Sequence, residues 1–338
     1  MVAPAKLEHL RVAVVGASLG GLSVANVVHK LGAKVAVFEL FPEGFHNRGG
    51  ALGAVDIGLV QQIRGGASPR VIRGHGHFYG DLWQHLYEGL PAGTVSFGID
   101  ISSVVDPESD TPRLLIGDAT REFDLIIGAD GGKSSLRSFV TSKLPVYAGY
   151  TVWRGLVPVG LAPGPPSGRA TVGGVNYETL GFPCAGPEGT GDLWNCGMYM
   201  PMPESEVLPP SRNRQVAGDN AMKTVPAWVR KHSRPRLLPV SAPTTPVSHA
   251  TTATSVATTP SFLSQFVPLV RELFAAKNEA FWAACVANGK VASHPVWELA
   301  ADRVVKGRVL LLGDAAHMAS PRTGAGAYTA MVKLYSMV

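Results

Sequence analysis

Residues 309–317 read Val309-Leu310-Leu311-Leu312-Gly313-Asp314-Ala315-Ala316-His317, and Pro321 and Gly324-Ala325-Gly326 follow soon after. The apolar run predicts a buried strand that enters a Gly-Asp turn, and the Pro/Gly-rich loop predicts the start of a new helix. An acidic side chain at the carboxyl end of such a strand lies where α/β proteins hold ligands. Its carboxylate can accept hydrogen bonds from a polyol, while the helix start offers free N–H groups to an anion.

The N-terminal region supplies a second pattern of this kind, in which residues 11–22 read Arg11-Val12-Ala13-Val14-Val15-Gly16-Ala17-Ser18-Leu19-Gly20-Gly21-Leu22. We predict a buried strand over residues 12–15, a glycine-rich turn, an amphipathic helix to about Leu31, and a strand over residues 34–38 that ends in Glu39. A βαβ start with an acid roughly 20 residues past the turn is typical of dinucleotide binding. A lone glycine motif could also be a plain βα turn, and Glu39, which would bind ribose hydroxyls, favours the dinucleotide.

The glycine-rich turn departs from the usual G-x-G-x-x-G at one position, where Ser18 replaces the middle glycine. A serine is small enough to let a pyrophosphate approach, and its hydroxyl can add a hydrogen bond. The first glycine permits the tight turn, and the last lets helix and strand pack closely. The residues expected to bind the cofactor here are Gly16, Ser18, Leu19, Gly20 and Gly21.

A third segment, Phe123-Asp124-Leu125-Ile126-Ile127-Gly128-Ala129-Asp130-Gly131-Gly132-Lys133-Ser134-Ser135-Leu136-Arg137, is again a buried strand that ends in Asp-Gly. Ser134 or Ser135 is expected to cap the helix that follows. With this segment the chain resembles the FAD-dependent aromatic hydroxylases, the single-component flavoprotein monooxygenases. Their three motifs, G-x-G-x-x-G, Asp-Gly with a downstream Ser and Arg, and G-D-A-A-H…P…G-x-G, occur here in the same order.

Within that family, the run Tyr150-Thr151-Val152-Trp153-Arg154-Gly155-Leu156-Val157-Pro158 and the G-x-S-x-G-G turn look most like the 2,6-dihydroxypyridine hydroxylase branch. The resemblance covers about residues 10–227 and 262–331. It implies an α/β fold, with a Rossmann-like three-layer FAD-binding domain and an inserted, mainly β substrate domain. The expected division is a first part of the FAD-binding domain at 1–149, a substrate-side sheet at 150–227, an insertion at 228–261, and a helical connection and return to the FAD-binding domain at 262–338.

The resemblance also implies the cofactors and their contacts. FAD is expected, with NADH or NADPH as co-substrate; O2 adds at the flavin C4a position and an electron-rich aromatic or N-heteroaromatic ring is hydroxylated. Arg48 would contact the pyrophosphate, Asp130 would support the cofactor loops, and Asp314 would bind the ribityl chain. Backbone N–H groups around Gly324, Ala325 and Gly326 would face the flavin pyrimidine edge. No catalytic base is assigned, and His317 is expected to have a structural role.

The second sheet is expected to face the aromatic substrate. Short β-like runs near residues 150–159, 176–182 and 193–200 alternate with Gly/Pro turns. An aromatic lining suits a flat ring, although ordinary sheet packing is the alternative for each side chain. The aromatic residues concerned are Trp153, Tyr177, Trp194 and Tyr199.

Composition excludes several other classes. Hydrophobic residues make up 46% of the 338-residue chain and charged ones 16%, so a sizeable core is expected. The net charge of +5 comes without basic runs, which argues against nucleic-acid binding. The widely spaced Cys184, Cys196 and Cys285 suggest reduced thiols and a cytoplasmic location. Neither a signal peptide, a spanning helix nor a metal site is expected, and a homodimer is a further expectation.

Two departures from the family leave alternatives open. From Asn220 to Arg271 there is no Asp or Glu, and Pro239 to Pro260 consists mostly of Pro, Ser, Thr, Ala and Val. This composition indicates a disordered insertion. The helix that starts near Gly324 stops at Val338, where the family usually continues. An FAD oxidase or dehydrogenase, and a truncated, inactive FAD-binding remnant, are therefore the alternatives to a hydroxylase.

We predict that the stretch from Pro239 to Pro260 is dispensable for folding. Ordering it would cost about 1–2 kcal/mol per residue with little apolar burial in return. Replacing it with a short Gly/Ser linker should leave the Tm, measured by differential scanning calorimetry, nearly unchanged. A drop of more than about 5 °C would mean that the segment packs against the core.

Overall fold

The computed structural model describes residues 7–44, 50–53, 55–64, 76–164, 167–172, 175–186, 191–206, 276–287, 291–323, 326 and 330–331. Three of the expected cofactor-binding residues, Arg48, Gly324 and Ala325, lie outside these ranges, as does the expected insertion at 228–261. The description below concerns the stated ranges.

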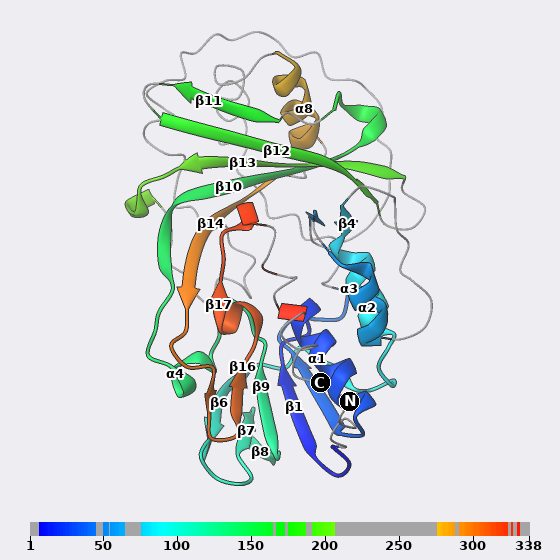
Figure 1. Cartoon of the computed structure of the whole chain (residues 1–338), viewed down its shortest axis with the longest axis vertical. Helices are drawn as coiled ribbons and strands as arrows, with labels where there is room; N and C mark the ends of the chain where they lie inside the picture. The colour runs from blue at the N-terminus through cyan, green and yellow to red at the C-terminus, as the bar shows by residue number, and fades with distance from the viewer. Residues whose placement is uncertain are drawn as a thin grey trace.

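The first of two large sheets is built on parallel strands, because its strands are apolar runs that both faces of a covered sheet can bury. It has six strands in the order β15-β16-β9-β1-β2-β5 (Figure 1). Strands β16, β9, β1, β2 and β5 run parallel, and β15 pairs antiparallel to β16 at one edge. The strands are β1 (Arg11–Val15), β2 (Lys34–Glu39), β5 (Val95–Phe97), β9 (Leu125–Gly128), β15 (Val305–Lys306) and β16 (Val309–Leu311).

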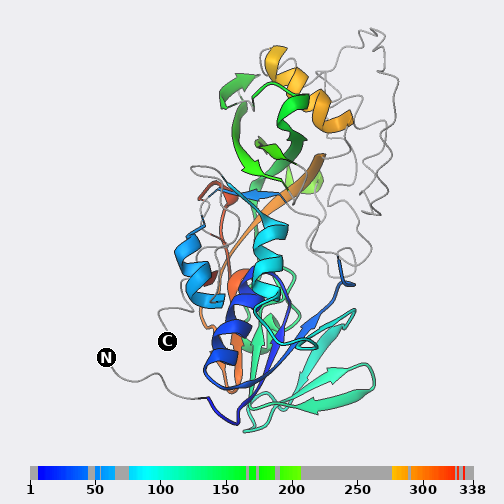
Figure 2. The same ribbon diagram turned by 90° about the vertical axis from the view of Figure 1, so that its right-hand side faces the viewer.

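Three layers form around this sheet, as the family resemblance implied. Alternate residues of β1 point to opposite faces, so Val12 and Val14 join one core cluster while Ala13 and Val15 join the other. The first cluster packs against helices and the second against a small antiparallel sheet, and Figure 2 shows these two layers on opposite sides. The helices are α1 (Leu19–Lys30), α2 (Ile57–Arg64) and α3 (Tyr79–Tyr87), and the small sheet consists of β6 (Ile101–Val105), β7 (Arg113–Ile116) and β8 (Ala119–Glu122).

The second large sheet is antiparallel in its main strands and has the order β11-β12-β13-β10-β14-β17 (Figure 1). Its fifth strand, β14, comes from the part of the chain expected to return to the FAD-binding domain. It pairs with β10 and joins this sheet. The strands are β10 (Val146–Pro158), β11 (Gly168–Val172), β12 (Val175–Ala185), β13 (Asp192–Pro201), β14 (Val291–Ala300) and β17 (His317–Met318).

Helix α8 (Ala276–Ala287) covers one face of this second sheet. The contact is closest at Gly155 of β10, where an added Cβ would lie 2.8 Å from the Trp282 ring and 2.9 Å from Cys285 Sγ. Both side chains are fully buried. Gly155 therefore lets the helix approach the sheet, and it identifies the face that α8 occupies.

The opposite face of the second sheet contacts a separate two-stranded antiparallel sheet, β3 (Ala51–Leu52) and β4 (His77–Phe78), and β4 leads directly into α3. The Ala51 N–H donates to Asn195 Oδ1 at 3.3 Å, and the Gly76 N–H donates to the Pro183 carbonyl at 3.0 Å. Hydrogen bonds therefore join the β3–β4 sheet to the second large sheet.

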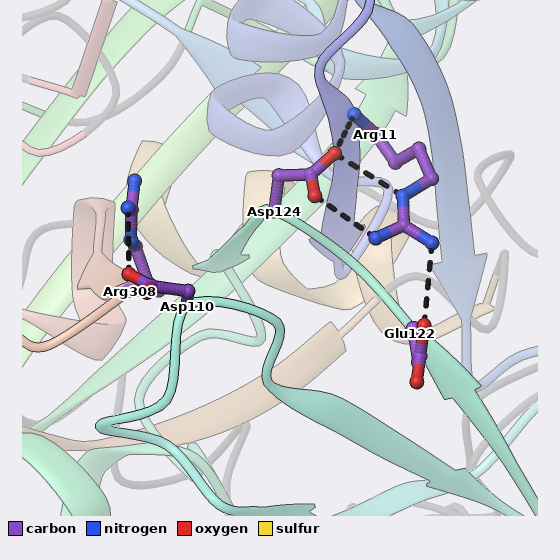
Figure 3. A network of polar contacts seen from close by, with 5 residues as sticks. All are labelled: Arg11, Asp110, Glu122, Asp124 and Arg308. Carbon is purple, nitrogen blue, oxygen red and sulfur yellow. Dashed lines mark hydrogen bonds and ion pairs between the residues drawn. The ribbon is translucent and has the colours of Figure 1, made fainter.

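The start of β1 is fixed by a polar network, in which Arg11 meets the residue before β9 (Figure 3). The backbone N–H and Nε of Arg11 donate to Asp124 Oδ2 at 2.7 and 3.1 Å, and Nη2 donates to Oδ1 at 2.9 Å. Glu122 adds an ion pair to Arg11 at 3.5 Å. These hydrogen bonds from Arg11 lower the pKa of Asp124.

We predict that this network stabilises the fold above about pH 4 and not in strong acid. Because the folded pKa of Asp124 is depressed, its contribution is present above the unfolded pKa and disappears as the pH falls through the folded value. Asp124→Asn should therefore lower the Tm at pH 7 and have a smaller effect at pH 3. Calorimetry at the two pH values checks this, and an equal loss at both would contradict it.

Candidate functional site

Four predicted site residues meet at one edge of the parallel sheet. The register pairs Val15 with both Gly128 and Phe38, and pairs Gly128 with Leu311. The four strands therefore end level with one another. Glu39 is the last residue of β2, whereas Gly16, Asp130 and Asp314 come just after the ends of β1, β9 and β16. Residues from both ends of the chain meet at the carboxyl edge, where open α/β sheets bind ligands.

The glycine-rich turn has no room for larger side chains at its first and last glycines. Gly16 has a φ of 101°, and a Cβ there would lie 2.4 Å from the carbonyl oxygen of Ala129. A Cβ on Gly21 would lie 1.9 Å from the Gly16 carbonyl oxygen. Gly20 differs, because only Ala330 lies within reach, at 3.4 Å. The turn therefore brings α1 against β1 and β9.

The first turn of α1 is open to an anion. Ser18 occupies the N-cap position, makes no side-chain cap hydrogen bond, and is followed by no acid in the first turn. Its exposed hydroxyl pairs instead with the Tyr79 hydroxyl at 2.8 Å. Leu19, the first helical residue, is buried. The N-terminal N–H groups of a helix in this state form a favourable phosphate site.

Glu39 reaches back to the glycine-rich turn. Its Oε2 accepts the Ala17 N–H at 2.7 Å, and its Oε1 accepts the Phe41 N–H at 3.0 Å. Each carboxylate oxygen has a second lone pair, so the half-buried side chain can still accept hydroxyl groups. Trp83 fixes the same turn from α3, because its Nε1 donates to the Ala17 carbonyl at 2.6 Å.

Among the described residues, only one of the two carboxylate oxygens of Asp130 accepts hydrogen bonds. Its Oδ2 accepts the Ser135 N–H at 2.7 Å and the Ser135 hydroxyl at 3.1 Å. Its Oδ1 is buried and has no hydrogen-bond partner among the residues that the structure describes. A buried acceptor without a hydrogen-bond donor costs free energy. This oxygen can therefore accept a hydrogen bond from a ligand.

Neither Ser134 nor Ser135 occupies the N-cap of the helix that follows, contrary to the expectation: the N-cap residue is Leu136, and it makes no side-chain cap hydrogen bond. The short helix α4 spans Arg137–Val140. Ser134 Oγ accepts the Arg137 N–H at 3.0 Å, whereas the Ser135 hydroxyl donates to the Ile101 carbonyl at 2.8 Å.

Arg137 joins the second motif to the third. Its Nε donates to the Ala315 carbonyl at 2.9 Å, and its Nη2 donates to the Asp314 carbonyl at 3.0 Å. The same Nη2 lies 3.2 and 3.0 Å from the carbonyls of Gly131 and Gly132. The side chain is buried, and this burial lowers the pKa of its guanidinium, opposed by the charges of Asp130 and Asp314. The sequence analysis placed Arg137 in the Asp-Gly motif, but the position of Arg137 in that motif did not predict that it would bind the third motif.

Asp314 meets solvent while protein surrounds it on most sides. The residue is exposed, yet desolvation by its surroundings raises the pKa of the carboxyl, and the charge of Arg137 only opposes this. Gly313 before it has a φ of 60°, and Ala330 lies next to both Gly313 and Gly20. The third motif is thus placed against the first.

These residues fit an FAD. An open helix start suits the pyrophosphate, the Glu39 carboxylate suits ribose hydroxyls, and the recessed Asp314 carboxylate suits a polyol. The orphaned Asp130 oxygen offers a further acceptor. Gly326 has open space where a Cβ would stand. Arg48, Gly324 and Ala325 cannot be placed in this arrangement.

Within the described part of the chain, no helix combines the length and apolar character that a membrane span needs. The same part of the chain contains no group of three or more His, Cys, Asp or Glu side chains that could hold a metal ion.

Comparison with known proteins agrees with this reading. A family model described as an FAD binding domain matches residues 270–337. The 3-amino-4-hydroxybenzoate 2-monooxygenase of Streptomyces cremeus is 33% identical over 190 residues, 46% of this chain and 48% of that protein. The FAD-dependent monooxygenase SAT7 of Stachybotrys chartarum is 30% identical over 256 residues, 72% of this chain and 46% of that protein. The chain therefore spans about half the length of these curated relatives.

Solved structures share the fold. The 2,6-dihydroxypyridine-3-hydroxylase of Arthrobacter nicotinovorans superposes with a TM-score of 0.71 at 21% identity, over 97% of this chain and 82% of that one. The Rossmann-like sheet, the three motifs in order and these relatives make the chain similar to the FAD-dependent aromatic hydroxylases, and residues 270–337 match their FAD binding domain.

Proposed function

We propose that this protein is an FAD-dependent monooxygenase that hydroxylates an electron-rich aromatic or N-heteroaromatic ring at the expense of NADH or NADPH and O2. The observation that carries the proposal is the meeting of Gly16, Glu39, Asp130 and Asp314 at one sheet edge. When bound, FAD would accept reducing equivalents from the nicotinamide and activate O2 for transfer to the ring. The relatives named above are both called monooxygenases, and this supports the same chemistry.

The residues of the chain would hold and shield the cofactor. The turn from Gly16 to Gly21 and the start of α1 would neutralise the pyrophosphate. Glu39 would bind the adenosine ribose and Asp314 the ribityl chain. Arg137, which donates to carbonyls of both loops, would hold the loops that carry Asp130 and Asp314 next to each other. The face of the second sheet that meets β3 and β4 would exclude water from the reacting ring.

We also propose that the chain divides near residue 150, with a substrate-side domain built on the second sheet. The membership of β14 in that sheet argues for adding residues 291–300 to this domain. A homodimer and a cytoplasmic location stay predictions.

The expected result of the functional test is label in the product. With isotopically labelled O2 and NADPH or NADH, a panel of hydroxylated pyridines and phenols should include a ring that accelerates nicotinamide oxidation. Its product should gain one labelled oxygen ortho or para to an existing hydroxyl, as mass spectrometry would show. Peroxide alone across the panel would contradict the hydroxylase and favour an oxidase, and absence of flavin from the purified protein would favour an inactive remnant.

A further inference from the structure

One arginine of the third motif reaches the second sheet. Arg322 lies beyond Asp314 in that motif, in the described segment that ends at residue 323. Its Nε lies 3.5 Å from Glu178 Oε2, and its guanidinium carbon lies 4.9 Å from the ring centres of both Tyr150 and Tyr199. These three partners belong to β12, β10 and β13. One side chain from the FAD-domain side therefore contacts three strands of the second sheet.

The three partners of Arg322 share one face of the sheet. Glu178 of β12 pairs directly with Tyr199 of β13. Tyr199 pairs in turn with Val152 of β10, two residues from Tyr150. Directly paired residues of antiparallel strands share a face, as do residues two apart along a strand. Gly155, an odd number of positions from Val152, faces α8, so the three partners lie on the face away from that helix.

The backbone of the same segment is held as well. Ser320 Oγ accepts the Arg322 N–H at 3.2 Å and lies 2.5 Å from the Tyr150 hydroxyl. Before it, β17 pairs with β14 at the edge of the sheet over two residues only. Ser320 and Arg322 thus carry the segment beyond β17 onto the face of the sheet.

The contacts of Arg322 differ in their expected strength. Its side chain is 46% exposed, so the ion pair with Glu178 is weak by itself. The two ring contacts are expected to be stronger, because Tyr199 is buried and Tyr150 is half-buried, and because a guanidinium stacks on an aromatic face. We refer to the contacts of Arg322 with these three residues as the Arg322 clamp.

A second arginine on this face has a different origin. Arg154 lies two residues from Val152 in β10 and therefore shares the face. It has no carboxylate partner in the described part of the chain, and burial lowers the pKa of its guanidinium. Of the two arginines, only Arg322 comes from the third motif and so joins that motif to the sheet.

We propose that Arg322 is a positioning residue: the Arg322 clamp sets the distance between the cofactor and the ring that is hydroxylated. The inference rests on the proposed function, in which Asp314 binds FAD and the second sheet faces the ring. The clamp joins the two, because it ties the segment after Asp314 to the sheet face that looks away from α8. Arg322 acts through that segment and takes no part in the chemistry.

The distance between cofactor and ring decides where the electrons of the nicotinamide go. In the coupled reaction, NAD(P)H, H⁺, O2 and the ring give NAD(P)⁺, water and the hydroxylated ring. When the ring is out of reach, the same two electrons and two protons reduce O2 to H2O2, and the ring is unchanged. Because a misplacement of about 1 Å can slow a positioned reaction roughly a hundredfold, loss of the clamp should shift the balance toward H2O2.

Hydrogen–deuterium exchange tests the clamp without turnover. The FAD-loaded wild-type protein would be compared with Arg322→Gln by mass spectrometry of peptides that cover residues 312–323. We expect exchange there to be about fivefold faster or more in the variant, because the segment opens locally more often. Arg169→Gln is the matched control: Arg169 lies the same 3.5 Å from Glu178, but it comes from β11 and is 84% exposed. It should leave the exchange unchanged.

The yield of product per nicotinamide tests the positioning role. With a hydroxylated pyridine or phenol that the wild-type protein oxygenates, Arg322→Gln should give about half the product or less per nicotinamide oxidised, and the difference should be found as H2O2. Arg322→Lys keeps a cation near the rings and should restore part of the yield. Because the proposed FAD contacts are intact, the Kd for FAD, measured by flavin fluorescence, should change by less than about threefold.

Two results would overturn the inference. Exchange in Arg322→Gln as slow as in Arg169→Gln would mean that the clamp does not hold the segment, and faster exchange with an undiminished yield would mean that it does not position the ring. If Arg322→Gln does not load FAD, the milder Arg322→Lys is compared in the same way with Arg169→Lys. Failure of the proposed function looks different, because the wild-type protein would then purify without flavin or give no oxygenated product, and the positioning role would be contradicted with it.

Discussion

Replacing Arg137 with methionine should lower the free energy of unfolding by about 3 kcal/mol or more, because it leaves buried carbonyls without donors. The side chain is buried and donates to the carbonyls of Gly131, Gly132, Asp314 and Ala315. These belong to two loops far apart in sequence. Methionine fills similar volume but makes none of these bonds.

Urea unfolding of the flavin-free protein, followed by tryptophan fluorescence, measures this loss. Arg137→Lys should fall between wild type and Arg137→Met, since it keeps the charge and some of the donors. Arg308→Met is a control, because its ion pair with Asp110 is exposed; it should cost about 0.5 kcal/mol or less. An Arg137→Met loss no larger than that of the control would mean that the two loops are held by other contacts.

Replacing Asp314 with alanine should weaken FAD binding by about 2–3 kcal/mol, which corresponds to roughly a hundredfold rise in Kd, because a hydrogen bond to a charged acceptor is lost. Asp314→Asn keeps one acceptor oxygen and should weaken binding less. Asp110→Ala removes the same charge from an exposed position and should leave the Kd unchanged. Quenching of flavin fluorescence measures each Kd.

The flavin-free Asp314→Ala protein should be no less stable than wild type at pH 7. Its surroundings raise the pKa of the Asp314 carboxyl, so the folded state disfavours the ionised form and stability from this group increases as the pH falls toward the folded pKa. Removing the carboxyl removes that penalty. Weakened FAD binding together with a marked loss of Tm would indicate misfolding and not a lost ligand contact.

Local patterns in the sequence predicted the cofactor side of the fold well. The strand, glycine turn and helix at residues 11–30 are confirmed, as are the strands that end before Asp130 and Asp314. These elements are set by short apolar runs and by positions at which only glycine fits. Leu82, Leu86 and Leu90 fall at helical spacing and predict a core-facing helix over about residues 78–90. This is confirmed, and the helix spans Tyr79–Tyr87.

The small strands near residues 94–117 were predicted less completely. The alternating runs near residues 94–105 and 113–117 predict a small β-meander over the nucleotide domain. In the structure β5 joins the parallel sheet, and β6, β7 and β8 form the separate small sheet. A short strand has too few side chains for its sequence to predict which sheet it joins.

The sequence alone could not predict on which face of the second sheet each of the four aromatic side chains lies. Register places Trp153 and Trp194 on the α8 face of the second sheet, with Gly155, and Tyr177 on the face opposite to Glu178 and Tyr199. Of the four aromatic residues, only Tyr199 looks toward the FAD-domain side. Alternation separates two faces, but strand register and the helix that covers one of them depend on contacts distant in sequence.

Arg137 and Arg154 were not assigned roles for a related reason. Each lay in a recognised run, but neither spacing nor composition tells which arginine will be buried against carbonyls and which will have no carboxylate partner in the described part of the chain. Those properties arise from the packing of β9 against β16 and of β10 against β13. They become visible only when the hydrogen-bond partners of each side chain are known.

The most direct test of the central claim is an FAD titration of four proteins: wild type, Glu39→Ala, Asp314→Ala and the double variant. We expect wild type to bind one FAD per chain and each single variant to bind more weakly. The two losses should add, because the residues would contact opposite ends of one cofactor. Binding in which neither substitution changes the Kd, or no FAD binding by the wild-type chain, would contradict a cofactor site made from both ends of the sequence.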